Sequence, residues 1–142
     1  MTSHIRLEIT PAAAMGLVQG ALDHARANGW EVAVAVVDPY GYLVAFGRSD
    51  NASPPVGEFA IDKAYTAGTL RRSSKSFGER MASSPRLSLG LGSRPRLMAW
   101  GGGVAVVEGE TCIGGLGVSG AQEHEDIACA EAALRALGLG AG

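Results

Sequence analysis

Two pairs of apolar segments, each joined by a short turn, constrain the fold of this chain most strongly. The first pair is the run at 31–37 and the run at 42–46, joined by the turn residues Asp38–Gly41. The second pair is 104–107 and 112–118, joined by another short turn. Runs rich in β-branched residues between turn signals are typical of buried strands, and short connections join antiparallel neighbours. The sequence therefore predicts two β-hairpins in a mostly antiparallel sheet.

Segments with helical spacing of apolar residues lie on either side of these hairpins. A first helix begins at Thr10–Pro11, which supply an N-cap and a first-turn proline, and ends at Asn28–Gly29. Three further helices are predicted, over residues 56–70, near 74–82, and before a closing Gly138. Because hairpins and helices share one chain of ordinary domain length, we predict a single α+β domain over residues 1–142, with helices packed on the sheet.

The segment 71–96 is polar and irregular. After the short helix near 74–82 we expect a mobile loop, and then a strand at 96–100 that enters Gly101–Gly103. A long irregular segment in a compact domain is typical of a functional region or an interface. Ten of the twelve cations are arginines, and five of these lie between Arg71 and Arg94. Such a cluster suits an acidic small ligand or an interface.

The overall composition excludes several classes of protein. The net charge of −2 predicts no nucleic-acid binding. No apolar run reaches about 18 residues, so we expect no membrane span, and the first residues lack the apolar core of a signal peptide. Cys112 and Cys129 form no metal-binding or redox motif, so we expect no metal site and a reducing, cytoplasmic setting.

Lys63 is the most informative single residue. At about 100° per residue, it falls near the centre of the apolar stripe of helix 56–70, which contains Val56, Phe59, Ala60, Ala64, Ala67 and Leu70. The structural interpretation is a side chain that reaches solvent or pairs with a carboxylate. The functional interpretation is an ammonium group with a lowered pKa beside a cavity. We expect this side chain to point into a pocket at the sheet edge or at a subunit boundary.

His124 lies within Gln122–Asp126, at the start of the last helix. Its acidic neighbours suit a helix N-terminus, which is the structural interpretation of this segment. The functional interpretation is that His124 binds a metal or a haem iron, or moves a proton, with Asp126 as a partner. Both interpretations stay open at the level of the sequence.

Three further features are candidate ligand contacts. Gly101–Gly103 is not a phosphate-binding loop, because no helix and no Lys-Ser/Thr pair follows it, but its amides can bind a carboxylate. Asp38 closes a turn or faces a ligand. Arg71 follows the helix at 56–70, where a cation suits the helix dipole or grips an anionic ligand.

Five segments resemble, in order, motifs of the GlcG/HbpS-like family: Val34–Phe46, Asp62–Ala67, Gly102–Val104, Gly114–Gly120, and Asp126 with Ala130–Ala132. The similarity runs from about Thr10 to Leu137. It implies a profilin-like three-layer α/β/α domain around a five-stranded antiparallel sheet, and a homo-oligomer. Members of the family include a secreted haem-binding sensor, a protein of glycolate-utilisation operons and the C-terminal domain of some corrinoid adenosyltransferases. The chain departs from the family pattern at Gly101, where proline is common, at Ala121, where glycine is common, and in having no counterpart of the sensor's iron motif.

Two functions follow from these residues and from the resemblance. The first is a small-ligand-binding protein whose ligand is haem or another tetrapyrrole, although the aromatic content of 6% weighs against a snug haem pocket. The second is a cofactor-independent isomerase, hydratase or lyase acting on a small carboxylic acid. Lys63 would lie in its pocket, with His124 or Asp126 as the partner and the Gly101–Gly103 amides as an anion seat. A structural subunit is a third interpretation, so the sequence leaves enzyme activity open.

Overall fold

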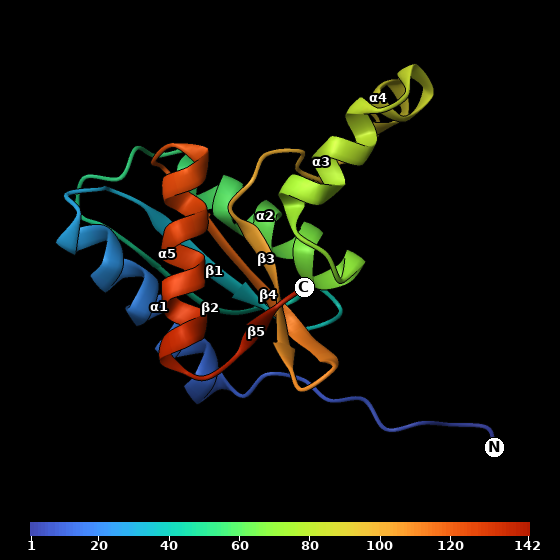
Figure 1. Cartoon of the computed structure of the whole chain (residues 1–142), viewed down its shortest axis with the longest axis horizontal. Coiled ribbons are helices and arrows are strands. Elements are labelled where there is room, and N and C mark those ends of the chain that lie inside the picture. Colours follow the sequence, from blue (N-terminus) through green and yellow to red (C-terminus); the bar gives the residue numbers. More distant parts are fainter.

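The computed structural model describes residues 1–142, which form five helices and one five-stranded sheet (Figure 1). The helices are α1 (Pro11–Ala27), α2 (Val56–Leu70), α3 (Ser74–Ala82), α4 (Pro85–Leu91) and α5 (Glu123–Ala136). The strands are β1 (Ala33–Val37), β2 (Leu43–Arg48), β3 (Gly103–Glu108), β4 (Thr111–Ser119) and β5 (Gly140–Ala141). Every strand pair is antiparallel, and the order is β2-β1-β4-β3-β5. The predicted α+β fold and both hairpins are confirmed.

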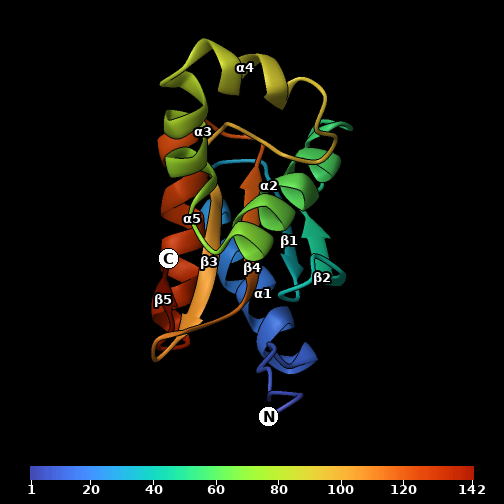
Figure 2. The same cartoon turned by 90° about the vertical axis from the view of Figure 1, so that its right-hand side faces the viewer.

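Helices cover both faces of the sheet and produce the expected three layers (Figures 1 and 2). α1 and α5 pack against each other on one face, and α2 crosses the opposite face over β1, β3 and β4. This sandwiching explains why all five residues of β1 are buried, since side chains on both faces of that strand meet a helix. β2 lies at the edge of the sheet and is largely exposed or half-buried.

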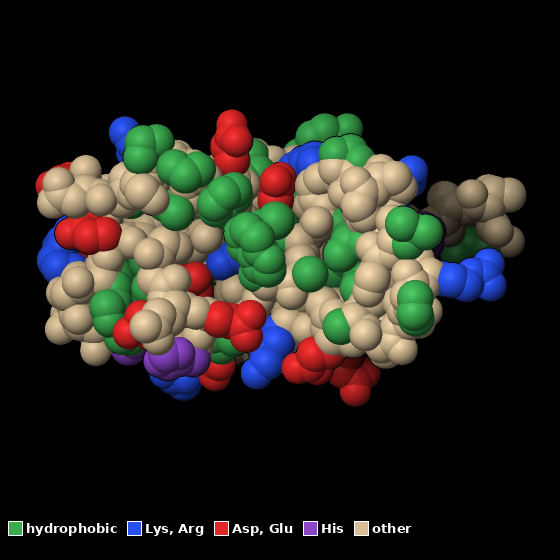
Figure 3. Space-filling model, turned by 90° about the horizontal axis from the view of Figure 1, so that it is seen from above, with side chains coloured by type: hydrophobic (Ala, Val, Ile, Leu, Met, Phe, Trp, Pro, Cys, Tyr) green, Lys and Arg blue, Asp and Glu red, His purple; other side chains and the backbone are tan.

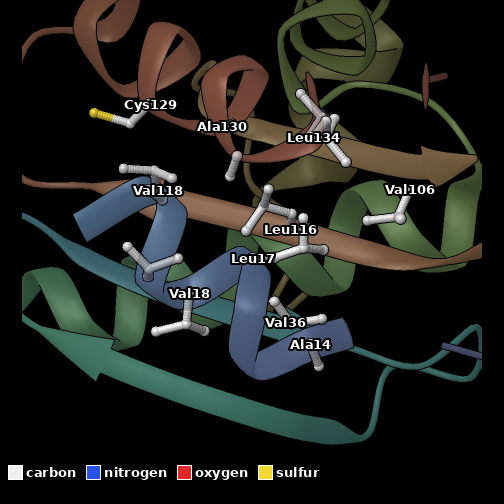
Figure 4. Packing of buried hydrophobic residues seen from close by; sticks show 14 of the residues in the cluster. Ala14, Leu17, Val18, Val36, Val106, Leu116, Val118, Cys129, Ala130 and Leu134 are labelled. Atoms are coloured by element: carbon white, nitrogen blue, oxygen red, sulfur yellow. The ribbon is translucent and has the colours of Figure 1, made fainter. Parts of the chain in front are cut away.

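The main hydrophobic core lies between the sheet and the α1–α5 layer (Figure 4). Leu17 of α1 and Leu134 of α5 meet Val36, Val106 and Leu116 of the strands there. Thr10 caps α1 as predicted, because its hydroxyl accepts a hydrogen bond from the amide of Ala13 at 3.1 Å.

The second core layer, between the sheet and α2, is built from small residues. A methyl group added at Gly115 or Gly117 of β4 would collide with the carbonyl oxygens of Ala64 or Ala60 of α2. The two strand glycines therefore let the helix backbone approach the sheet closely, as glycines in strand interiors are expected to do. This close approach brings Lys63, which lies between these two alanines, against the sheet.

Two predictions for the segment 83–100 are wrong. Residues 96–100 form no strand, and the fifth strand is instead β5 near the C-terminus. Arg96 has a φ of 75°, which a strand does not allow, and the amide of Met98 donates to the side chain of Thr66 rather than to a neighbouring strand. The expected mobile loop after α3 contains a second short helix, α4, which begins at Pro85 behind the N-cap Ser84.

Candidate functional site

Lys63 lies near the middle of α2, and its side chain crosses from the helix to the far end of β4. The ammonium nitrogen Nζ lies 3.1 Å from the carboxylate oxygen Oδ2 of Asp126 and donates a hydrogen bond to the carbonyl oxygen of Val118 at 3.0 Å. Only 2% of Lys63 and 2% of Asp126 is exposed. The predicted lysine on an apolar helix face therefore forms a buried ion pair.

Asp126 is held by the N-terminal turn of α5. Its second carboxylate oxygen accepts a hydrogen bond from the amide of Ala121 at 3.0 Å. Just before it, the side chains of Gln122 and Glu125 form a capping box that fixes the start of the helix. The helix dipole favours a carboxylate at this position, so Asp126 is oriented towards Lys63 by local structure as well as by charge.

Burial shifts the pKa values of both partners towards the neutral forms. Desolvation lowers the pKa of Lys63, with the charge of Asp126 acting in the opposite direction. Desolvation also raises the pKa of Asp126, with Lys63 again opposing the shift. The pKa values of the two groups are therefore closer together than those of a lysine and an aspartate in water.

The Gly101–Gly103 loop lies against this ion pair. Gly102 has a φ of 122°, and a methyl group there would lie 2.9 Å from Nζ of Lys63. The amides of Gly101 and Gly103 donate to the side chains of Glu123 and Ser74, both at 2.9 Å. An external carboxylate would have to compete with these internal acceptors for two of the three amides.

A cavity of about 400 Å³ borders the same loop. It is lined by Ser73, Lys75, Gly102, Gly103, Val104, Ile127, Glu131, Ala141 and Gly142. Lys63 does not line this cavity, because Gly102 lies against its ammonium group. The prediction that the Lys63 side chain points into a pocket is therefore wrong: its ammonium group is instead buried against Asp126 and Val118. The ion pair thus lies behind the wall of a cavity of ligand size, and Gly102 forms that part of the wall.

A larger cavity, of about 520 Å³, lies between the N-terminal segment and the β3–β4 hairpin. It is lined by His4, Ile5, Arg6, Leu7, Arg71, Val107, Glu110, Thr111 and Cys112. The lining combines two guanidinium groups and an imidazole with aliphatic side chains. Such a mixture suits an apolar ligand that carries acidic groups.

A family model described as haem degrading protein HbpS-like matches residues 9–135. This chain belongs to the HbpS-like family. Protein GlcG of Escherichia coli (strain K12) is 34% identical over 106 residues, which cover 75% of this chain and 77% of GlcG. The resemblance seen in the sequence is therefore confirmed.

Two solved structures share the fold of nearly the whole chain. The protein ORFY of Klebsiella pneumoniae superposes with a TM-score of 0.90 at 27% identity, covering 97% of this chain and 96% of that chain. The PduOC:heme complex superposes with a TM-score of 0.86 at 24% identity, covering 94% and 98% of the two chains. At that identity the second comparison shows the common fold.

The other predicted site residues of this HbpS-like chain lie apart from the ion pair. His124 is exposed and lines neither cavity, although it belongs to the same helical turn as Asp126. Asp38 closes the β1–β2 turn, because its carboxylate accepts hydrogen bonds from the amides of Tyr40 and Tyr42 at 2.8 and 3.1 Å. Arg71 adopts a left-handed conformation at the end of α2 and lines the larger cavity.

Several residues that position the site were missed by sequence reasoning. The hydroxyl of Ser74 donates to the carbonyl oxygen of Trp100 at 2.6 Å. The hydroxyl oxygen of Thr66 accepts a hydrogen bond from the amide of Met98 at 2.9 Å. Both anchors are buried polar residues, and neither lies in a recognisable motif. The N-terminal cavity wall did leave a signal, since residues 4–9 alternate polar and apolar side chains.

No group of three or more His, Cys, Asp or Glu side chains in the structure is arranged to hold a metal ion. None of the helices has the length and apolar character needed to cross a membrane.

Proposed function

We propose that this chain binds a small ligand, and that the ligand is haem or another tetrapyrrole. The cavity of about 520 Å³ between the N-terminal segment and the β3–β4 hairpin is the observation that carries the proposal. A cavity of this size is typical of small-molecule and cofactor sites. Membership of the HbpS-like family, whose description names haem, supports the choice of ligand.

The residues that line the cavity fit a tetrapyrrole with acidic side chains. Ile5, Leu7 and Val107 offer apolar contact to a flat ring, and the guanidinium groups of Arg6 and Arg71 suit carboxylates. Arg6 also lies 4.4 Å from the ring centroid of Tyr40, which holds its side chain in place. The imidazole of His4 is the candidate iron ligand in this cavity.

Haemin titration followed by absorption spectroscopy tests the proposal. Wild-type protein is expected to give a saturable Soret shift. Arg71→Ala should weaken binding about tenfold, because a charge-assisted contact is lost, and His4→Ala should change the position of the Soret band. His124→Ala is the matched control, since it removes an exposed imidazole that lines neither cavity.

Two outcomes would contradict this assignment. A wild-type protein without a saturable Soret shift would remove haem as the ligand. A His124→Ala protein that loses the shift, while His4→Ala keeps it, would move the iron ligand to the start of α5.

A cofactor-independent enzyme acting on a small carboxylic acid is the second candidate function. The buried Lys63–Asp126 pair beside the cavity of about 400 Å³ favours it, since the pKa shifts of both groups suit acid–base chemistry. Because Gly102 separates the pair from this cavity, an isomerisation, hydration or elimination would require the Gly102 backbone to move aside. Asp126 would then accept a proton and Lys63 would stabilise the developing negative charge.

A screen of small unsaturated and hydroxy acids tests this second function. Lys63→Met/Asp126→Asn removes both charges while keeping similar volumes, and it should abolish any turnover found with wild-type protein. Turnover that survives this double substitution would exclude the pair from the chemistry.

A further inference from the structure

A third cavity, of about 200 Å³, lies where the end of α1 meets the end of β2. Figure 1 shows these two ends on the same side of the molecule. The walls of the cavity come from the last two turns of α1, from residues 29–31 and from residues 48–51. None of these residues lines either of the cavities described above. A ligand bound here would therefore be independent of the proposed haem site.

The end of α1 holds Trp30 against this cavity. Gly29 has a φ of 74°, and the amides of Gly29 and Trp30 donate to the carbonyl oxygens of Arg26 and Ala25 at 3.1 and 2.9 Å. This is the Schellman pattern of helix termination, which fixes the direction of the chain after the helix. Trp30 and Leu22 are half-buried, and both pack against the main core. The apolar wall of the cavity is therefore in place before any ligand arrives.

The opposite wall, residues 49–51, is held by hydrogen bonds to the segment before β1. The hydroxyl oxygen of Ser49 accepts from the amide of Val32 at 3.1 Å, and the amide of Ser49 donates to the carbonyl oxygen of Val32 at 2.8 Å. The amide of Asn51 donates to the carboxylate of Glu31 at 3.2 Å. Both walls are thus fixed by backbone contacts.

Four charged side chains line this small cavity, two of each sign: Arg26, Arg48, Glu31 and Asp50. Neither arginine forms an ion pair, because the two ion pairs of the molecule are Lys63–Asp126 and Arg96–Asp62. Figure 3 shows acidic and basic side chains close together at the left-hand end of the molecule, where α1 and β2 end in Figure 1. The charges of this cavity are therefore available to a ligand that carries complementary groups.

We propose that this cavity binds a small aromatic acid whose ring also carries a hydrogen-bond donor. The guanidinium groups of Arg26 and Arg48 would donate to the acid group, since their planar forks match a carboxylate. The ring would pack against the indole of Trp30 and the side chain of Leu22. A hydroxyl on the ring would donate to the carboxylate of Asp50. That contact uses the acidic side of the cavity, which would repel a ligand with an acid group alone.

The size of the cavity limits the ligand to a single ring. A volume of about 200 Å³ lies below the range of about 300–1,000 Å³ that is typical of sites for drug-sized ligands. Hydroxybenzoates combine one ring, one carboxylate and one donor, so they are suitable probes of the proposed site.

Titration of isotopically labelled full chain with para-hydroxybenzoate, followed by NMR, is the first test. The chain has two tryptophans, and Trp100 does not line this cavity. The indole N–H signal of Trp30 should shift saturably, with a dissociation constant on the order of 1 mM, as expected for so small a ligand. The Trp100 signal, which Trp100→Phe identifies, is the reference and should not move. A Trp30 signal without a saturable shift would overturn the proposal, as would an equal shift of both signals.

The contact between the acid group and the arginines is tested with a neutral ligand and with a variant. Benzamide resembles benzoate in size but has no charge, so it should bind at least about tenfold more weakly. Arg48→Gln should weaken benzoate binding by a similar factor. Arg135→Gln, which removes an exposed arginine of α5 outside the cavity, is the matched control and should bind like wild type. Equal binding of benzamide and benzoate, or wild-type affinity of Arg48→Gln, would overturn the proposal.

The donor on the ring is tested by comparing meta- and para-hydroxybenzoate with benzoate. At least one hydroxybenzoate should bind wild type about fivefold more tightly than benzoate, and this preference should disappear in Asp50→Ala. Two hydroxybenzoates that bind no more tightly than benzoate would overturn the contact with Asp50. A saturating concentration of para-hydroxybenzoate should also leave the haemin titration unchanged, because the two cavities share no residue. Competition between the two ligands would overturn a separate site.

Discussion

In the folded protein the ammonium group of Lys63 donates to the carboxylate of Asp126 and to the carbonyl oxygen of Val118, whereas in the unfolded chain it is hydrated. Attraction between buried charges offsets their desolvation only in part, so a pair of this kind adds little net stability. The pKa shifts agree, because desolvation is the largest cause for both groups. Removing only one partner has a different effect, since it strands the other charge in the interior.

We therefore expect Lys63→Met to lower the free energy of unfolding by about 3–5 kcal/mol at pH 7, because Asp126 is left buried and unpaired. Adding Asp126→Asn should recover more than half of the loss, since the amide oxygen can still accept the hydrogen bond from Ala121. Urea denaturation of both variants measures the effect. A single variant as stable as wild type would mean that water reaches the carboxylate.

The two cysteine thiols should differ in reactivity. Cys129 is fully buried in the main core, and burial raises its pKa from 9.0 to about 11, whereas Cys112 is half-buried beside the larger cavity. Only the thiolate reacts with disulfide reagents. At pH 8 we expect one modified thiol in native protein and two in urea. Cys112→Ser should leave none in native protein, and rapid native labelling of Cys129 would contradict its burial.

The same thiol gives a pH dependence of stability. The folded protein keeps the Cys129 proton between pH 9.0 and about 11, where the unfolded chain has already released it. The stabilising effect is therefore complete below pH 9.0 and is lost as the pH rises to about 11. Wild type should lose more stability over this range than Cys129→Ala, as measured by urea denaturation. Parallel pH profiles of the two proteins would exclude this contribution.

At the scale of elements, the contact between α2 and β4 determines where Lys63 lies. Gly115 and Gly117 allow the helix backbone to approach the strand, and the alanines of α2 leave room for it. Larger side chains would push the helix outward. Lys63 would then be moved away from Val118 and from Asp126.

Gly117→Ala should accordingly destabilise the fold by at least about 1–3 kcal/mol, since its methyl group would collide with the carbonyl oxygen of Ala60. Gly90→Ala is the control, because nothing lies within 4 Å of a methyl group at that position of α4. That variant should be neutral or slightly more stable, as alanine favours helix. Thermal unfolding compares the two variants. If their unfolding midpoints were equal, α2 would be able to move away from β4 without a loss of stability.

At the scale of the whole molecule, the N-terminal segment adds surface rather than core. Residues 1–8 are exposed, and the segment joins the body where the amide of Ile9 donates to the carbonyl oxygen of Ile113 at 2.9 Å. Its residues 4–7 nevertheless form one wall of the larger cavity. The proposed binding function and the stability of the fold should therefore be separable.

Deletion of residues 1–6 tests this separation. The unfolding free energy should change by no more than about 0.5 kcal/mol, as is usual for exposed residues. Haemin affinity should fall at least about tenfold, because His4 and Arg6 are removed. Full-length protein is the reference for both measurements. Undiminished haemin binding would show that the ligand site lies elsewhere on the molecule.

Local sequence patterns determined much of this fold. The β-branched runs and their turns predicted both hairpins, the Thr10–Pro11 cap predicted the start of α1, and helical spacing placed Lys63 within the apolar stripe of α2. Such features depend on residues only a few positions apart in the chain, so they can be predicted from the local sequence. The family motifs extended the prediction to all three layers.

Tertiary structure alone decided the partners of the site. Lys63 and Asp126 lie 63 positions apart, and both were candidates, but only the packing of α2 and α5 at the end of β4 brings their side chains to 3.1 Å. The same holds for β5, which pairs with β3, and for the segment before α1, which completes the larger cavity. Contacts between distant segments depend on how whole helices and strands pack. The spacing of apolar residues within one segment shows which face of that segment is buried, but not which other segment covers it.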